Sequence, residues 1–574
     1  QVAELPGYEE AGPDTAEAIL DEAAKFASQV LAPMNREGDT VGCKWRDGEV
    51  TTPPGNKQAY AQYIAGGWTG LAFPQQYGGQ GLPKLLATAV HDIEQSANLG
   101  FSLAPGLSRG AIEALLLCGT DAQKERYLHR MIAGDWTGTM NLTEPQAGSD
   151  LGLLRTKAEP DGDHYRLYGQ KIFISHGEHD LAENIVHLVL ARLPDAPEGV
   201  RGISLFVAPK FLVNDDGTLG ARNDIRCVSI EHKMGLHASP TCVLAYGDRE
   251  GAIGTLIGEP NRGLEYMFIM MNEARFGVGL SGIAIAERAY QQALAYAKER
   301  VQSKDVANPR GPSVTIINHP DVRRMLMTMK ALIESTRALC YVVAGAMDHA
   351  HASPDEAERA RARAFTEIVV PIHKAWSTEM ALEVGNLAIQ VHGGMGFIEE
   401  TGVSQHMRDA RILSIYEGTT GIQANDLIGR KIARDGGATA KALAEQMKGA
   451  LAELSGNDDD SQAIRARLAD SIATFERCVD WIVANTKADV KGVHAGAVPF
   501  LKLAALTCGG WQMARAAAVA QRKLAAGEGD AEFMRAKIAT ARFYADHLMP
   551  QIVGLEHTVC KGAPGVMALS EAQF

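Results

Sequence analysis

The chain has 574 residues, of which 46% are hydrophobic and 22% charged, so it can build large cores and is too long for one ordinary domain. Its formal net charge of −13 argues against nucleic acid or an anionic membrane as the main partner. No apolar run reaches the ~18 residues of a membrane span. The eight scattered cysteines lack a CxxC pair, which predicts reduced thiols in a cytoplasmic protein and no metal framework.

Residues 1–138 have the pattern of packed helices. Ile19, Ala23, Phe26 and Val30 recur at spacings of four, three and four, which places them on one apolar helix face. Between the helices, residues 73–83 read FPQQYGGQGLP, a Pro- and Gly-rich stretch that is typical of a loop. The start of the chain shows no signal-peptide pattern, although a first residue of Gln rather than Met leaves a removed leader open.

From residue 139 to 259 the sequence changes to strands. The segments HYRLYGQKIFISH, NIVHLVLAR and GISLFVAPK are short, rich in β-branched and aromatic residues, and separated by turn residues. Ile203, Leu205 and Val207 alternate with Ser204 and Phe206, as expected for a strand. This region is predicted to be a small β-barrel or sandwich.

Helical spacing returns in residues 260–432, which we expect to form a helical bundle. Residues 438–574 are predicted to be an additional helical domain without a motif that carries chemistry. The residues that mark helix faces are Ile283, Ala286, Tyr290, Ala293 and Ala297 in the bundle, and Ile464, Leu468, Ile472, Phe475, Val479, Ile482, Met534, Ile538, Ala541, Ala545 and Leu548 in the last region.

One glycine motif imitates a dinucleotide fingerprint. Gly277, Gly279 and Gly282 match GxGxxG, but that fingerprint works only between a strand and a helix. Helical sequence both precedes and follows the three glycines here. We therefore expect them to allow close helix packing instead.

The most informative stretch is RILSIYEGTTGIQ at residues 411–423. Glu417 follows a bulky apolar run, and partial desolvation raises the pKa of a carboxylate and makes it a stronger base. Gly418 lets another molecule come close to the backbone. These features suit the removal of a weakly acidic C–H proton beside a flat cofactor. The alternative is an ordinary glutamate at a helix end before a glycine loop.

Two further segments occur with this stretch. Residues 141–155 read NLTEPQAGSDLGLLR, and residues 390–399 read QVHGGMGFIE. Together the three segments resemble the signature segments of the flavin-dependent acyl-CoA dehydrogenase family, in the family's order and over roughly residues 8–431. The resemblance implies a mostly α fold with a central β-domain and an FAD cofactor. The added C-terminal helical domain is similar to that of larger bacterial members.

The resemblance assigns flavin contacts to the first two-thirds of the chain. Leu142 and Thr143 would lie against the ring, with Thr143 donating a hydrogen bond. Ser149 would contact the FAD phosphates or the CoA arm, and Ser175 would bond the flavin. Phe173 stands where many relatives carry Trp behind the ring; it can still pack there, but the surface through which electrons leave would differ.

The remaining cofactor contacts come from the helical region. Arg300 matches an arginine that binds the FAD pyrophosphate, and a surface arginine at a helix end is the alternative. The resemblance implies that the glycine loop reaches the FAD of a neighbouring subunit. The residues of this loop that would contact FAD are Gln390, Gly393 and Gly394. Thr419, in the stretch that contains Glu417, would be a further flavin contact. Gly421 replaces a glutamine of the family, which puts one adenine-side contact in doubt.

For catalysis the resemblance implies that Glu417 is the base, with Glu273 as the fallback. Arg275 would set the environment of the base, and a structural ion pair is the alternative. Ser149, Glu417 and Gly418 would contact the acyl-CoA. The α-proton and a β-hydride of the thioester would be removed to give a trans-2-enoyl-CoA.

The resemblance also implies partners. We expect an electron-transfer flavoprotein as the electron acceptor and a homodimer as the assembly. The substrate is expected to be a fatty acyl-CoA or 3-methylmercaptopropionyl-CoA. An acyl-CoA oxidase that uses oxygen, and a catalytically silent helical scaffold, remain the alternatives.

Overall fold

The computed structural model describes residues 2–574, apart from the side chain of residue 270. The chain forms two compact units, Gln1–Gly277 and Val278–Phe574. The division falls inside one long helix, α7 (Gly263–Glu299). Each unit has its own buried hydrophobic residues.

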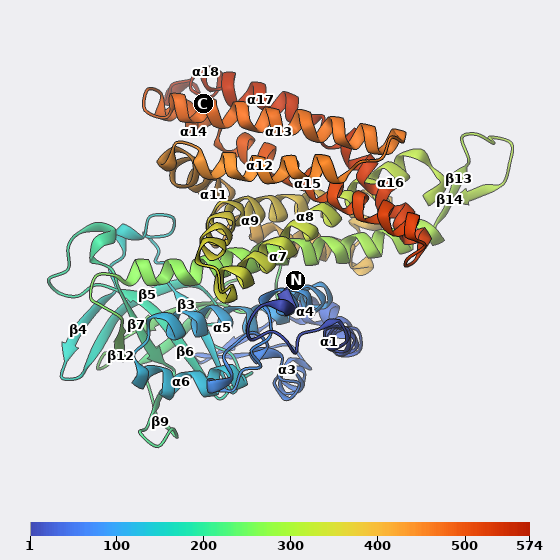
Figure 1. Ribbon diagram of the computed structural model, residues 1–574. Helices are drawn as coiled ribbons and strands as arrows, with labels where there is room; N and C mark the ends of the chain where they lie inside the picture. Colours follow the sequence, from blue (N-terminus) through green and yellow to red (C-terminus); the bar gives the residue numbers. More distant parts are fainter. Residues whose placement is uncertain (1) are drawn as a thin grey trace. The chain divides into compact units, whose positions relative to one another are not determined.

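The first unit begins with the predicted helices. They are α1 (Pro13–Phe26), α2 (Ala32–Val41), α3 (Asn56–Ala65), α4 (Lys84–Ala97), α5 (Leu99–Cys118) and α6 (Asp121–Ala133) (Figure 1). The predicted apolar face is confirmed over α1 and the π-helical turn that follows it (Ala27–Leu31), because Ala23 is buried and Ile19, Phe26 and Val30 pack against the same core. In the predicted loop, only Gln75–Tyr77 forms a short 3-10 turn.

Helix α5 is, by length and composition only, long and apolar enough to cross a membrane. Its inward residues belong to the unit's core. Phe101 and Ala104 pack with α1 and α3, while Ala111, Ile112 and Leu115 pack with the sheet. Arg109 and Glu113 also interrupt its apolar sequence. We therefore interpret α5 as a core helix.

The predicted β-domain is a single eight-stranded sheet with the order β10-β11-β5-β12-β7-β6-β3, in which β4 also pairs with β5. Strands β3 and β6 are parallel, and the other pairs are antiparallel. Strands β6 and β7 are buried throughout, which accounts for their nearly continuous apolar sequence. The strands are β3 (Trp136–Asn141), β4 (Lys157–Asp161), β5 (His164–Ser175), β6 (Asn184–Ala191), β7 (Ser204–Pro209), β10 (Ile225–Ile230), β11 (Thr241–Tyr246) and β12 (Ala252–Ile257).

Two small hairpins complete the first unit, and a third belongs to the second. The first two are β1–β2 (Lys44–Arg46 and Glu49–Thr51) and β8–β9 (Phe211–Val213 and Leu219–Arg222). The third, β13–β14 (Val301–Lys304 and Ser313–Thr315), extends away from the helices of its unit (Figure 1, right).

The second unit is helical. Its bundle contains the C-terminal part of α7, with α8 (Pro320–Ala352), α9 (Glu356–His392), α10 (Val403–Ala410) and α11 (Thr420–Asp426). The added region contains α12 (Ala438–Glu453), α13 (Asp459–Asn485), α14 (Val490–Ala495), α15 (Ala497–Ala526), α16 (Ala531–His547), α17 (Gln551–Lys561) and α18 (Ala563–Val566).

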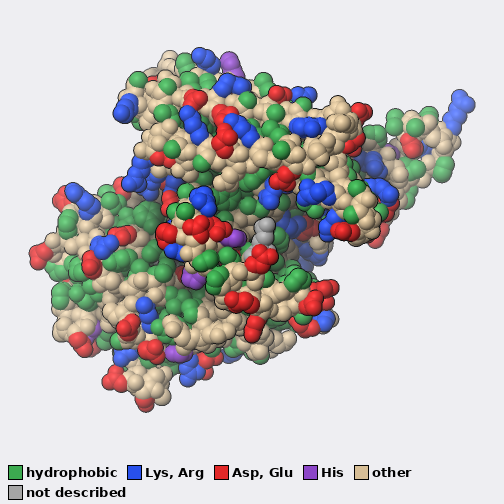
Figure 2. Space-filling model, in the orientation of Figure 1, with side chains coloured by type: hydrophobic (Ala, Val, Ile, Leu, Met, Phe, Trp, Pro, Cys, Tyr) green, Lys and Arg blue, Asp and Glu red, His purple; other side chains and the backbone are tan. Residues whose placement is uncertain are grey.

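The added helices pack directly on the bundle. Helix α15 contacts both α8 and α9, and α16 contacts α8. Lys537 of α16 forms an ion pair with Glu334 of α8 at 2.8 Å. Figure 2 shows basic and acidic side chains interspersed over these C-terminal helices at the top of the view. The tail therefore shares a core with the bundle rather than hanging from it by a linker.

The GxGxxG glycines lie inside α7 and allow it to approach α9, as predicted. A Cβ atom on Gly279 would lie 2.3 Å from the His373 ring, and one on Gly282 would lie 2.5 Å from the backbone oxygen of Ser377. Real Cβ atoms do not come so close to other heavy atoms. The two positions therefore have to be glycine for the helices to pack at this distance.

We expect Gly282→Ala to lower stability by about 1–3 kcal/mol, because the added methyl meets backbone that cannot move aside. Gly277→Ala is the matched control in the same helix, since its Cβ would have nothing within 4 Å. That control should gain up to about 1 kcal/mol from helix propensity. The thermal unfolding midpoints of both variants measure the difference, and equal midpoints would contradict the packing argument.

Candidate active site

Glu417 lies in a tight loop between a 3-10 turn, Arg411–Ser414, and helix α11. Its backbone has a φ of 54°, and Gly418 follows with a φ of 89°. A positive φ is unfavourable for a residue with a side chain, and such strain persists only where the surroundings impose it. Glu417 is half-buried. The loop is therefore held in an unusual conformation at the predicted base.

A lysine from α9 holds this loop. The Nζ of Lys374 donates to the backbone oxygens of Leu413 at 2.9 Å, Tyr416 at 3.0 Å and Gly418 at 2.6 Å. Lys374 is fully buried. A buried ammonium group is costly unless its donors are satisfied, and an ammonium has three N–H bonds to give. These hydrogen bonds fix the backbone on both sides of Glu417.

A glutamine supports the same loop from α11. The Nε2 of Gln423 lies 3.3 Å from the backbone oxygens of both Glu417 and Gly418. A Cβ atom on Gly418 would lie 2.6 Å from this Nε2, so the contact requires glycine. The hydroxyl of Thr419 caps α11 by accepting from the backbone N–H of Ile422 at 3.2 Å.

Tyr416 precedes the predicted base. Burial, together with the neighbouring Glu417 carboxylate, raises the pKa of the Tyr416 hydroxyl above its usual range.

The first unit contains the predicted flavin-contacting residues. The backbone N–H of Ile172 donates to the oxygen of Thr143 at 2.9 Å, which holds the segment after β3 beside the end of β5. Leu142, Thr143 and Ser175 are half-buried, and Ser149 is exposed. Phe173 has a φ of 60°, and its side chain is 60% exposed. The structure therefore holds Thr143 beside the last residues of β5, where Phe173 exposes its ring.

A buried ion pair joins the residues next to Thr143 and Ile172 in the sequence. Lys171 and Glu144 lie 2.8 Å apart, both buried, and Glu144 also accepts from the hydroxyl of Thr156 and the backbone N–H of Arg155 at 2.6 Å each. Burial works against ionisation of Glu144, but the Lys171 charge and these hydrogen bonds lower its pKa to about 2. Burial lowers the pKa of Lys171 to about 8, against the opposing effect of Glu144. Both groups are therefore charged at neutral pH.

Arg275 and Glu273, the other two catalytic candidates, lie on the part of α7 that belongs to the first unit. Arg275 is buried. Glu273 forms an ion pair with Lys84 of α4. Burial and the Glu273 carboxylate raise the pKa of Glu113 on α5 to about 7. Glu273 thus belongs to a charged cluster that the sequence did not reveal.

The glycine loop follows α9, as predicted. Gly393 has a φ of 59° and a ψ of −138°, which a residue with a side chain does not adopt readily, and a Cβ atom on Gly393 or Gly394 would meet nothing within 4 Å. Gln390 is exposed. His392 stacks on Tyr296 with ring centroids 4.3 Å apart, so its ring packs against α7.

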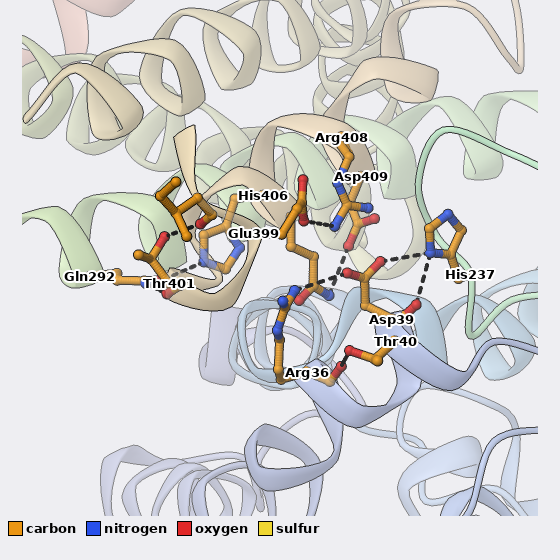
Figure 3. Close-up of polar contacts among 12 residues, drawn as sticks. Arg36, Asp39, Thr40, His237, Gln292, Glu399, Thr401, His406, Arg408 and Asp409 are labelled. Carbon is orange, nitrogen blue, oxygen red and sulfur yellow. Dashed lines mark hydrogen bonds and ion pairs between the residues drawn. The ribbon is translucent and has the colours of Figure 1, made fainter. Parts of the chain in front are cut away.

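The segment after the glycine loop is tied to α7 (Figure 3). Gln292 donates to the backbone oxygen of Thr401 at 2.8 Å and bonds His406 at 2.9 Å. Arg408 pairs with Glu399 at 3.1 Å. These contacts hold the segment while leaving the glycines open.

Arg300 follows the last residue of α7 and is exposed. Its backbone N–H donates to the oxygen of Tyr296, and its oxygen accepts from Ile316, each at 2.8 Å. The backbone is thus fixed at the base of the β13–β14 hairpin while the guanidinium faces solvent.

Four family models match consecutive parts of the chain. They are the N-terminal domain of acyl-CoA dehydrogenases at residues 13–135, the middle domain at 139–248, the C-terminal domain at 261–432 and the acetyl-CoA dehydrogenase C-terminal-like domain at 438–570. The chain belongs to the acyl-CoA dehydrogenase family. The predicted class, an FAD-dependent oxidoreductase with an added helical domain, is confirmed.

The chain is also similar to individual named acyl-CoA dehydrogenases. The chain is 52% identical to 3-methylmercaptopropionyl-CoA dehydrogenase of Ruegeria pomeroyi, over 96% of this chain and 93% of that protein. It is 38% identical to a butyryl-CoA dehydrogenase of Syntrophomonas wolfei, over 95% and 91%. The structure of the acyl-CoA dehydrogenase complexed with FAD from Bacillus anthracis has the same fold, with a TM-score of 0.76 at 20% identity over 97% of this chain and 90% of that one. The named relatives are dehydrogenases, which does not favour the oxidase alternative.

The described residues fit an FAD cofactor. Phe173 exposes its ring two residues before Ser175, and Thr143 is held to Ile172 by a backbone hydrogen bond, so an aromatic face and hydroxyl groups that suit a flat ring with polar edges occur in one short region. In the other unit, Gly393 and Gly394 leave open space over their backbone, as a phosphate or adenine group requires.

Sequence reasoning missed Lys374, Gln423 and the Glu144–Lys171 pair. Lys374 lies in the largely apolar stretch EIVVPIHKAW, and a lysine there is a signal of a buried, bonded charge. That signal gives no partner. Only the fold brings Lys374 to Leu413, 39 residues away.

We expect Glu144→Gln to destabilise the first unit by about 3–5 kcal/mol, because Lys171 would remain a buried charge without its partner. The pKa of Glu144 is lowered in the folded state, so its stabilising contribution is complete above pH 4.5 and is lost as the pH falls toward 2. Thermal unfolding between pH 7 and pH 2 checks both points. Glu159→Gln, an exposed change on the neighbouring strand, is the control. An unchanged midpoint for Glu144→Gln would contradict the role of the pair.

Proposed function

We propose that Glu417 is the catalytic base of this acyl-CoA dehydrogenase. Its carboxylate takes the α-proton of an acyl-CoA thioester, the β-hydrogen leaves with its electron pair, and the two carbons form the trans double bond of a 2-enoyl-CoA. FAD supplies the acceptor for that hydride when it is bound. The observation that carries the proposal is a half-buried carboxylate held in a strained loop by a buried lysine.

A thioester makes its α-proton acidic, but not enough for a solvated carboxylate to remove it readily. Partial desolvation of Glu417 narrows this gap, and so do hydrogen bonds to the thioester oxygen. The backbone N–H of Glu417 is the donor that we assign to that oxygen. Arg275 is proposed to set the charge environment of the base, and Gly418 to admit the acyl-CoA close to the backbone.

We assign the cofactor contacts by the same family pattern. Thr143 and Ser175 donate to the flavin ring, Leu142 and Phe173 pack against it, and the phosphates are held by basic and backbone groups. The residues proposed to bind FAD are Leu142, Thr143, Ser149, Phe173, Ser175, Arg300, Gln390, Gly393, Gly394 and Thr419. Ser149 is also proposed to contact the CoA arm.

The proposed substrate is a short acyl-CoA, with 3-methylmercaptopropionyl-CoA first and an unbranched fatty acyl-CoA second. The sequence identity of 52% with the Ruegeria pomeroyi enzyme, over 96% of this chain, supports this choice. An electron-transfer flavoprotein is the proposed acceptor of the electrons. The cytoplasm remains the proposed location, and all eight cysteines are free thiols.

A homodimer is the proposed assembly. Met395, Phe397 and Ile398 follow the glycine loop and are exposed, Phe397 to 88%. Three exposed apolar side chains in one short segment mark a surface that a second copy would cover. The tail helices on α8 and α9 occupy bundle surface that would otherwise be free for a further dimer.

Glu417→Gln should keep FAD but lose bleaching of the flavin by acyl-CoA under anaerobic conditions, by several orders of magnitude. Glu273 is the fallback candidate for the base. The Glu273→Gln variant should bleach at a rate within about tenfold of the parent, a difference of about 1.4 kcal/mol in activation free energy. Bleaching of the flavin is measured with 3-methylmercaptopropionyl-CoA, butyryl-CoA and palmitoyl-CoA. Near-normal bleaching by Glu417→Gln would move the role elsewhere. A protein that takes up no FAD would favour the silent scaffold.

Light scattering of the holoenzyme should give the mass of two chains. Phe397→Ser should weaken the dimer and lower its FAD content, because cofactor contacts from the glycine loop would be lost with the neighbouring copy. Val553→Ser, an exposed apolar change on α17, is the control. A tetramer of the parent protein would contradict the proposed role of the tail.

A further inference from the structure

We propose that Lys374 is a positioning residue that strengthens the backbone N–H of Glu417 as the hydrogen-bond donor to the thioester oxygen. This inference rests on the proposed function of Glu417. It adds a group from α9 that touches neither substrate nor cofactor and acts through one peptide bond.

The argument begins with the peptide unit between Tyr416 and Glu417. The carbonyl oxygen of Tyr416 accepts a hydrogen bond from the Nζ of Lys374 at 3.0 Å. The N–H on the opposite side of that planar unit belongs to Glu417. A charged donor on the oxygen draws electron density through the amide and makes its N–H a stronger donor. The ammonium therefore acts directly on the proposed oxyanion contact.

Two further bonds of Lys374 orient the same N–H. They hold the oxygens of Leu413 at 2.9 Å and Gly418 at 2.6 Å, on either side of Glu417. The strained φ of 54° at Glu417 lies between these two fixed points. A donor that is already oriented before substrate arrives needs no reorganisation during the reaction.

Burial of Lys374 strengthens the effect of its charge on the backbone N–H of Glu417. The side chain of Lys374 has no solvent exposure, so water does not screen the ammonium. Gln423 offers a comparison, because it also supports the loop through the oxygens of Glu417 and Gly418. Gln423 is neutral and makes no bond to the Tyr416 oxygen. Substitutions of Gln423 and of Lys374 can therefore distinguish support of the loop from polarisation of the peptide unit by a charge.

The test measures the carbonyl stretch of crotonyl-CoA, labelled with ¹³C at the carbonyl and bound to the holoenzyme. We expect the parent protein to shift this stretch to lower wavenumber relative to the free ligand. Lys374→Met should lose much of the shift and bleach about 10- to 100-fold more slowly at saturating acyl-CoA, with FAD retained. Gln423→Leu should keep the shift. If Lys374→Met does not fold, Lys374→Gln provides the same neutral comparison while retaining two N–H donors.

A parental shift and parental bleaching rate in the lysine variants would overturn the inference. So would an equal loss of shift in Gln423→Leu, which would reduce Lys374 to a loop support. Glu417→Gln separates this result from the proposed function, because it keeps the backbone N–H and should keep the shift while losing bleaching. If Glu417→Gln bleaches normally, the proposed base is wrong, whereas the shift in the Lys374 variants still reports on the lysine.

Discussion

The hydrogen bonds from the buried ammonium of Lys374 to three carbonyl oxygens are the interaction on which the proposed site depends. Burying a lysine is unfavourable unless its donors find acceptors. Here the acceptors are the backbone of the loop that carries Glu417. Neither partner is stable alone in this arrangement, since the loop has a strained φ and the lysine has no water. Helix α9 and the loop therefore form one structural element.

The rest of the second unit sets the place of that lysine. Gly279 and Gly282 let α7 approach α9 on the helix turns that carry His373 and Ser377, next to Lys374 in sequence. Among the tail helices, α15 packs on α8, α9 and α11, and α16 packs on α8. Beyond α9, Gln292 holds the segment that follows the glycine loop. The packing of α7 on α9 thus connects the base loop, which Lys374 of α9 holds, with the segment after the glycine loop, which Gln292 of α7 holds.

Much of this was predictable from the sequence because it is local. Helical spacing located α1, α7, α13 and α16, alternation located β7, and the Glu417 stretch gave the base as a prediction. The contacts of Lys374, the pairing of Glu144 with Lys171 and the cluster around Glu273 were not predictable. Each joins elements far apart in the chain, and a buried lysine has no periodic pattern that identifies its partner. Positive φ at Glu417 was also hidden, since glutamate gives no local signal for it.

The removal of the α-proton by Glu417 can be measured apart from hydride transfer. In 3-thiabutanoyl-CoA a sulfur atom replaces the β-carbon, so the α-proton can be lost but no β-hydride is available. We expect the parent holoenzyme to give a new long-wavelength absorbance as the resulting enolate interacts with oxidised flavin, and Glu417→Gln to bind the ligand without this band. A band of equal intensity in Glu417→Gln would contradict the account.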